Sequence, residues 1–214
     1  MSYNKILLAA IAMTFTLTQL CHADLIVDNF SESGGGGYGL NSTFFGVQRN
    51  KVAQEFNTGG RDFRLNGISV MIIRDSAIAD FSGELWSSNA ANMPDTLLGT
   101  LSLANNPSPT GFSEYYFRAD GTIQLDGQSN YFFSVEDNVS DLSAIAGSVF
   151  GSNNYTGPGN ILDNVRLQSS SSSPWTPFGS NAVLLKVVGN PEPNSIMLLG
   201  VAFGGLLLKR RRRR

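Results

Sequence analysis

Short runs in which apolar and polar residues alternate recur along the middle of the chain and predict β-strands. The longest is 63–73, whose largely apolar stretch 68–73 is typical of a central strand. Gly, Asn, Ser and Pro bound the runs at short intervals, and no amphipathic helix of useful length interrupts them. We therefore predict an all-β fold, an antiparallel, jelly-roll-like β-sandwich. The other predicted strands are 25–27, 52–56, 81–86, 97–103, 112–117, 123–125, 131–135 and 183–188.

Two segments rich in small residues predict loops. Residues 31–39 include four consecutive glycines, and 169–173 are all serine. The glycine-rich segment lacks the Gly-Lys-Ser/Thr ending of a phosphate-binding loop, and no dinucleotide-binding spacing follows a predicted strand. We expect both segments to be flexible connections.

The first 23 residues have the three parts of a secretory signal peptide. Lys5 supplies a positive charge, residues 6–17 are mostly apolar, and Cys21-His22-Ala23 ends in a small residue. We predict export through the Sec translocon and cleavage by signal peptidase after Ala23. The alternative is an uncleaved anchor, for which twelve apolar residues are short.

The last 24 residues combine a motif, an apolar segment and a basic end. Pro191-Glu192-Pro193 precedes the uncharged segment 196–208, a predicted short transmembrane helix. Thirteen helical residues reach roughly 20 Å at about 1.5 Å per residue, whereas a hydrocarbon core is about 30 Å thick. Such a segment can hold a translocating chain briefly, present the motif outside the inner membrane, and be cut. The basic residues that should stay in the cytoplasm are Lys209 and Arg210, Arg211, Arg212, Arg213 and Arg214.

This order of motif, apolar helix and arginine cluster resembles the PEP-CTERM sorting domain. The resemblance covers 191–214 and implies a sorting signal that an exosortase, a transpeptidase-like membrane enzyme, processes at the motif. It also implies delivery to the cell surface or extracellular matrix of a bacterium that makes extracellular polysaccharide. An ordinary single-pass tail anchor is the alternative. The expected organisation is a signal peptide at 1–23, a β-sandwich domain at 24–190 and a sorting signal at 191–214.

The body between these ends is acidic and lacks the usual catalytic side chains. The whole chain of 214 residues has a net charge of −2, but 24–190 contains eight basic and sixteen acidic residues, a net charge near −8. Nucleic acid is therefore excluded as an expected partner. The only cysteine and histidine, Cys21 and His22, lie in the predicted signal peptide. After cleavage the body would contain no thiolate and no imidazole, and it could form no disulfide. No Ser-His-Asp triad or Cys-His pair would then be available.

The body also resembles, more loosely, the choice-of-anchor domains, which are β-rich exported modules. The resemblance spans 52–188 and starts with Gln54-Glu55-Phe56 and Thr58-Gly59. It continues through Leu85-Trp86, Leu97-Leu98-Gly99-Thr100-Leu101 and Tyr131-Phe132-Phe133. It implies no activity that can be assigned to particular residues.

Two kinds of chemistry stay open for the body. A pair of carboxylates suffices for a glycosidase, and oxygen ligands suit calcium. The calcium candidates are the turns Asp120-Gly121, Asp126-Gly127 and Glu136-Asp137-Asn138, none of which has the spacing of a twelve-residue calcium loop. We expect no cofactor, and calcium is the one metal considered. The aromatic side chains considered as stacking faces for sugar are Trp86, Trp175, Tyr38, Tyr115, Tyr116 and Tyr155, with core packing as the simpler expectation.

The sequence thus predicts an exported, non-enzymatic surface or matrix protein. The alternative is a secreted carbohydrate-binding module or a carboxylate-only glycosidase. In either case, extracellular polysaccharide is the candidate partner of the body.

Overall fold

The computed structural model describes residues 23–31, 34–42, 48–49, 51–74, 80–107, 111–138, 143–148, 154–169, 173–178 and 181–192. These residues form antiparallel β-strands and turns, with no helix among them. The predicted all-β class is therefore confirmed. The predicted signal peptide up to residue 22, the motif residue Pro193, the helix 196–208 and the arginines 210–214 lie outside the described residues.

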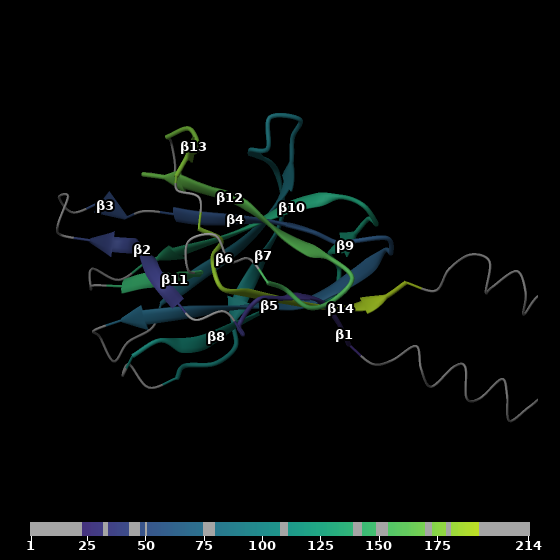
Figure 1. Ribbon diagram of the computed structural model, residues 1–214, viewed down its shortest axis with the longest axis horizontal. Coiled ribbons are helices and arrows are strands. Elements are labelled where there is room, and N and C mark those ends of the chain that lie inside the picture. Colours follow the sequence, from purple (N-terminus) through teal and green to yellow (C-terminus); the bar gives the residue numbers. More distant parts are fainter. Residues whose placement is uncertain are drawn as a thin grey trace, which may run out of the picture.

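The described strands are hydrogen-bonded into one continuous assembly, in which two sheets are joined at one edge through β7 (Figure 1). We name each sheet after its central strand. The β10 sheet has the order β13 (Thr176–Pro177), β12 (Asn160–Gln168), β4 (Lys51–Asn57), β10 (Asn130–Asp137), β6 (Phe81–Ser88) and β7 (Pro94–Leu103). The β5 sheet has the order β8 (Ser113–Arg118), β5 (Phe63–Arg74), β11 (Ser143–Ser148), β2 (Gly34–Ser42) and β3 (Gln48–Arg49). Here β14 (Leu185–Pro191) and β9 (Gln124–Leu125) also pair with β5, and β1 (Asp24–Asp28) pairs with β14.

Strand β7 joins the sheets because it changes partner part-way along. Leu101 still lies opposite Gly83 of β6, whereas the next residue, Ser102, lies opposite Arg118 of β8. The chain therefore passes from one sheet to the other within a single strand.

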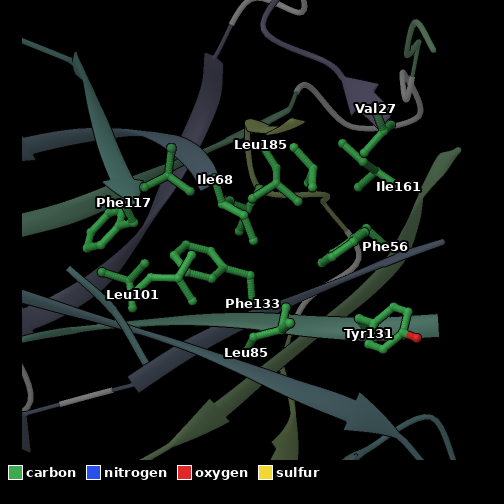
Figure 2. Packing of buried hydrophobic residues seen from close by; sticks show 14 of the residues in the cluster. Val27, Phe56, Ile68, Leu85, Leu101, Phe117, Tyr131, Phe133, Ile161 and Leu185 are labelled. Atoms are coloured by element: carbon green, nitrogen blue, oxygen red, sulfur yellow. The ribbon is translucent and has the colours of Figure 1, made fainter. Parts of the chain in front are cut away.

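The core lies between the two sheets. Figure 2 shows Ile68, Phe117 and Leu185 of the β5 sheet pointing toward Leu85 and Phe133 of the β10 sheet. The rings of Phe117 and Phe133 pack edge to face with centroids 5.4 Å apart, a favourable aromatic geometry. Alternate residues of each strand supply this core, as the period of two along a strand requires.

The predicted strands are present, and one predicted loop is wrong. The glycine-rich segment 31–39, expected to be flexible, contains the start of β2, which pairs along β11 from Gly34 to Asn41. An added Cβ at Gly37 would lie 3.1 Å from the carbonyl oxygen of Ile145, so a glycine suits the close approach of the two backbones. Strands β3, β11, β12 and β13 were not predicted either.

The two ends of the described body lie on neighbouring strands. In β1, Asp24 is the antiparallel partner of Gly189 in β14, so both ends leave the same end of the domain (Figure 1). Ala23, the predicted cleavage residue, is exposed next to Asp24. Within the described part of the chain, no helix is long and apolar enough to cross a membrane.

Tyr131, which is buried, and Tyr38, which is half-buried, predict a loss of stability at alkaline pH. Burial raises the pKa of Tyr131 and of Tyr38 above the ordinary value of 10.0. The folded state therefore keeps these protons to higher pH than the unfolded state does. Their contribution is complete below pH 10 and is lost as the pH rises through the folded-state pKa values. Denaturant unfolding between pH 8 and 11.5 should show this loss, and the double variant Tyr38→Phe, Tyr131→Phe should show a shallower one.

Candidate functional site

The face of the β10 sheet that points away from the core is unusually polar and unusually buried. On β4, Val52 and Phe56 point into the core, so Lys51, Ala53 and Glu55 lie on the opposite face. All three are nevertheless buried, because other chain segments cover them. We call this surface the outer face. Its members are Lys51, Ala53 and Glu55 of β4, Phe132, Ser134 and Glu136 of β10, Glu84, Trp86 and Ser88 of β6, and Asn164, Arg166 and Gln168 of β12.

At the centre of the outer face is the buried carboxylate of Glu55, which is 0% exposed. Its Oε1 accepts hydrogen bonds from Ser88 Oγ at 2.8 Å and Asn130 Nδ2 at 3.1 Å. Its Oε2 accepts one from Asn164 Nδ2 at 2.5 Å. Among the described ion pairs, none includes Glu55. The carboxylate is thus held by three neutral donors, one each from β6, β10 and β12, which orient it as an acceptor.

A second cluster of charged side chains on the outer face is centred on a lysine. Lys51 Nζ lies 2.8 Å from Glu84 Oε2 and 3.4 Å from Glu136 Oε2. The side chain of Lys51 is only 9% exposed, so the two ion pairs are screened less than surface pairs are. Lys51 therefore holds two carboxylates from neighbouring strands in fixed positions.

Two tryptophans meet over the outer face. Trp86 and Trp175 pack edge to face with ring centroids 6.0 Å apart, and both are half-buried. Trp86 Nε1 also donates to Ser134 Oγ at 3.1 Å, which fixes the plane of the indole. In the sheet, β4 and β10 separate the strand of Trp86 from β12 and β13, which flank Trp175. The segment that contains Trp175 therefore reaches across the outer face.

The turn between β6 and β7 also covers the outer face. Arg166 Nε donates to the carbonyl oxygen of Asn92 at 2.9 Å, and its guanidinium carbon lies 5.9 Å from the ring centroid of Phe132. Asn92 has a φ of 53°, a left-handed conformation that asparagine tolerates well. This turn and the Trp175 segment explain why Phe132 and Ser134 are fully buried on a face turned away from the core.

The three predicted calcium turns take part in local hydrogen bonding. Hydrogen bonds from the hydroxyl and then the backbone of Thr122 lower the pKa of the exposed Asp120. Asp126 donates its backbone N–H to the hydroxyl of Tyr131 at 2.8 Å. Asp137 is buried and accepts a hydrogen bond from the hydroxyl of Ser143. Among the described residues, no three acidic, histidine or cysteine side chains form a group that could hold a metal ion.

The structure separates the aromatic candidates. Trp86 and Trp175 lie together on the outer face, whereas Tyr115 is in the core and Tyr38 packs against Phe178. Tyr116 is half-buried, and its hydroxyl donates to the carbonyl oxygen of Asn66 at 3.2 Å. Tyr155 is 42% exposed next to the bridge between Asp28 and Thr156.

The beginning of the predicted sorting motif is paired with the sheet. Pro191 is the last residue of β14 and lies opposite Phe63 of β5. The Glu192 N–H donates to the carbonyl oxygen of Asp62 at 3.0 Å, and Glu192 Oε1 lies 3.4 Å from Arg64 Nε. These two motif residues therefore extend the folded body by two positions beyond residue 190.

No model of a known protein family matches this chain, and no curated protein gives a significant match. The functional argument therefore depends on the geometry. Sequence reasoning missed the buried polar members of the outer face, above all Glu55, Lys51 and Arg166. The available signal was the spacing of Lys51 and Glu55, which lie four positions apart and therefore on the face opposite Val52 and Phe56 of the core.

Proposed function

We propose that this chain is an exported, non-enzymatic surface or matrix protein whose β-sandwich body is delivered by its C-terminal tail. The proposal includes an exosortase-type processing enzyme as a transient partner at the inner membrane. It is supported by the end signals in the sequence and by the pairing of β1 with β14, which puts both ends of the body at one end of the domain. The rest of the body is then free to face away from the membrane.

Deleting residues 193–214 tests the delivery. The deletion should start at Pro193, because removing Pro191 and Glu192 would also remove the pairing with Phe63 and Asp62. We expect the truncated body to appear in the medium and to be lost from the surface and matrix fractions. As a matched control, Pro193→Ala keeps the apolar segment and the arginines, and should stay in the membrane fraction. Unchanged surface location after the deletion would contradict the proposal.

The outer face supports saccharide binding as a second candidate function. Half-exposed indole rings offer apolar faces to sugar rings, and the nearby carboxamides and hydroxyls match sugar hydroxyl groups. The half-buried polar groups that Glu55 orients are Ser88, Asn130 and Asn164, next to the Trp86–Trp175 pair. Because the body is acidic, an uncharged polysaccharide is the expected ligand rather than an anionic one.

The same contacts favour binding over hydrolysis. A glycosidase needs one carboxyl group that donates a proton and a second that acts as base or nucleophile. Glu55 accepts three hydrogen bonds, and Glu84 and Glu136 share the ammonium of Lys51. These three carboxyl groups of the outer face are thus engaged by donors within the protein.

Binding to uncharged and anionic polysaccharides tests this second function. We expect the body to bind an uncharged glucan or mannan and Trp86→Ala to weaken binding about tenfold, or about 1.4 kcal/mol. Trp175→Ala should act in the same direction. Phe112→Ala is the matched control, because Phe112 is 45% exposed and precedes β8 in the other sheet. Thermal melts should first establish that each variant is folded. Equal binding by Trp86→Ala and wild type, or release of reducing sugar, would contradict the candidate.

A further inference from the structure

The folded body includes the first two residues of the predicted sorting motif, and this limits where the tail can be removed. Strand β14 lies between β5 and β1, so its backbone is paired on both sides through most of its length. Gly189 pairs with Asp24 on one side and Leu65 on the other. Peeling β14 away from its C-terminal end would therefore disturb two strand pairs as soon as it reached Gly189.

The last contacts of this strand lie at Glu192. Its N–H donates to the carbonyl oxygen of Asp62, and its carboxylate faces Arg64. The side chains of Arg64 and Glu192 are 50% and 31% exposed, so the ion pair adds little stability and mainly orients Glu192. The backbone pairing of Pro191 and Glu192 along β5 is the main restraint.

Enzymes that cut peptide bonds act on unpaired backbone, which is why cleavage concentrates in exposed segments without hydrogen bonds. From this pairing, and resting on the proposed sorting function, we infer that Pro191 and Glu192 stay with the mature body and that the tail is cut on the C-terminal side of Glu192. In that step one peptide C–N bond breaks. The carbonyl carbon takes the oxygen of water or the nitrogen of an amine acceptor, and the tail leaves with a new amino terminus.

Two measurements on the full chain test the inference. The first is the intact mass of the mature protein from the producing cell, which should end at Glu192 or beyond. The second is digestion of the purified full chain in detergent with a broad-specificity protease, which should trim the tail and stop at or after Glu192. A limit fragment or mature protein that ends at or before Pro191 would overturn the inference. A tail that is never removed in the cell would instead count against the proposed sorting function.

An insertion gives the matched control. Placing Gly-Ser-Gly-Ser between Asn190 and Pro191 moves the motif away from Asp62 and Phe63 but leaves Asn190 opposite Arg64. The protease limit should then move back into the insertion, with the rest of the body intact. An unchanged limit at Glu192 in this variant would show that the pairing is not what protects the segment, and would overturn the inference.

Discussion

Replacing Phe117 by alanine should lower the free energy of unfolding of the body by about 3–5 kcal/mol, the usual cost of deleting a fully buried phenylalanine ring. Phe117 is 0% exposed and lies opposite Ile68 of β5 and Leu103 of β7. Its ring packs against Phe133 of the other sheet. The truncation therefore opens a cavity at the point where β7 joins the two sheets. Urea unfolding of residues 24–192 measures the effect, and Phe112→Ala, at an exposed site, should change it by less than about 0.5 kcal/mol.

A double-mutant cycle with Gly83 tests whether the Phe117 ring occupies the space next to Gly83. An added Cβ at Gly83 would lie 2.8 Å from Phe117 Cδ1 and 3.0 Å from Phe133 Cε2. Gly83→Ala alone should therefore cost about 1–3 kcal/mol through overpacking. In the Phe117→Ala background the closer clash is absent, so the same change should cost less. Strictly additive effects would mean that Gly83 and Phe117 do not share this space.

The sequence predicted strands well where one face is apolar and the register is regular. Tyr131, Phe133 and Val135 of β10 alternate, and all three are in the core. The pattern failed at β12, where the pairing with β4 shifts between Ile161 and Val165. This bulge puts three residues opposite Glu55 and breaks the alternation, but it also brings Asn164 to the Glu55 carboxylate. The bulge that disrupts the strand pattern in the sequence thus also places Asn164 beside Glu55.

Burial of the outer face depends on segments distant in sequence, which local patterning does not encode. Arg166 is buried because the turn at Asn92 folds over it, and Trp175 reaches Trp86 on the same face from the opposite edge of the sheet. The sequence around each of these residues is polar and, considered alone, is typical of an exposed loop or strand. By contrast, β2 was missed because its sequence is rich in glycine, which disfavours strands in general. Here Gly37 allows close pairing with β11.

Glu55→Leu should be the most damaging substitution on the outer face, lowering the free energy of unfolding by about 2–3 kcal/mol. The change leaves the donors of Ser88, Asn130 and Asn164 without their acceptor, and each lost hydrogen bond is worth about 1 kcal/mol. The substitution also removes the desolvation cost of burying a carboxylate, and this gain offsets part of the loss. Urea unfolding of the variant body measures the net effect, and a stability equal to or above that of wild type would contradict the assigned network.

Glu55→Gln separates the loss of hydrogen bonds from the loss of charge. Its Oε1 can still accept from Ser88 and Asn130, and its Nε2 would face Asn164 Nδ2, so two donors would meet. Asn164 can relieve this by rotating its amide to present Oδ1, which accepts only a long contact of 3.5 Å from Arg166 Nη2. We therefore expect Glu55→Gln to lose less than half as much stability as Glu55→Leu. The double variant Glu55→Gln, Asn164→Asp should then recover little further stability, because the rotated Asn164 amide already supplies an acceptor. A large recovery of stability would show that Asn164 is fixed in its present orientation.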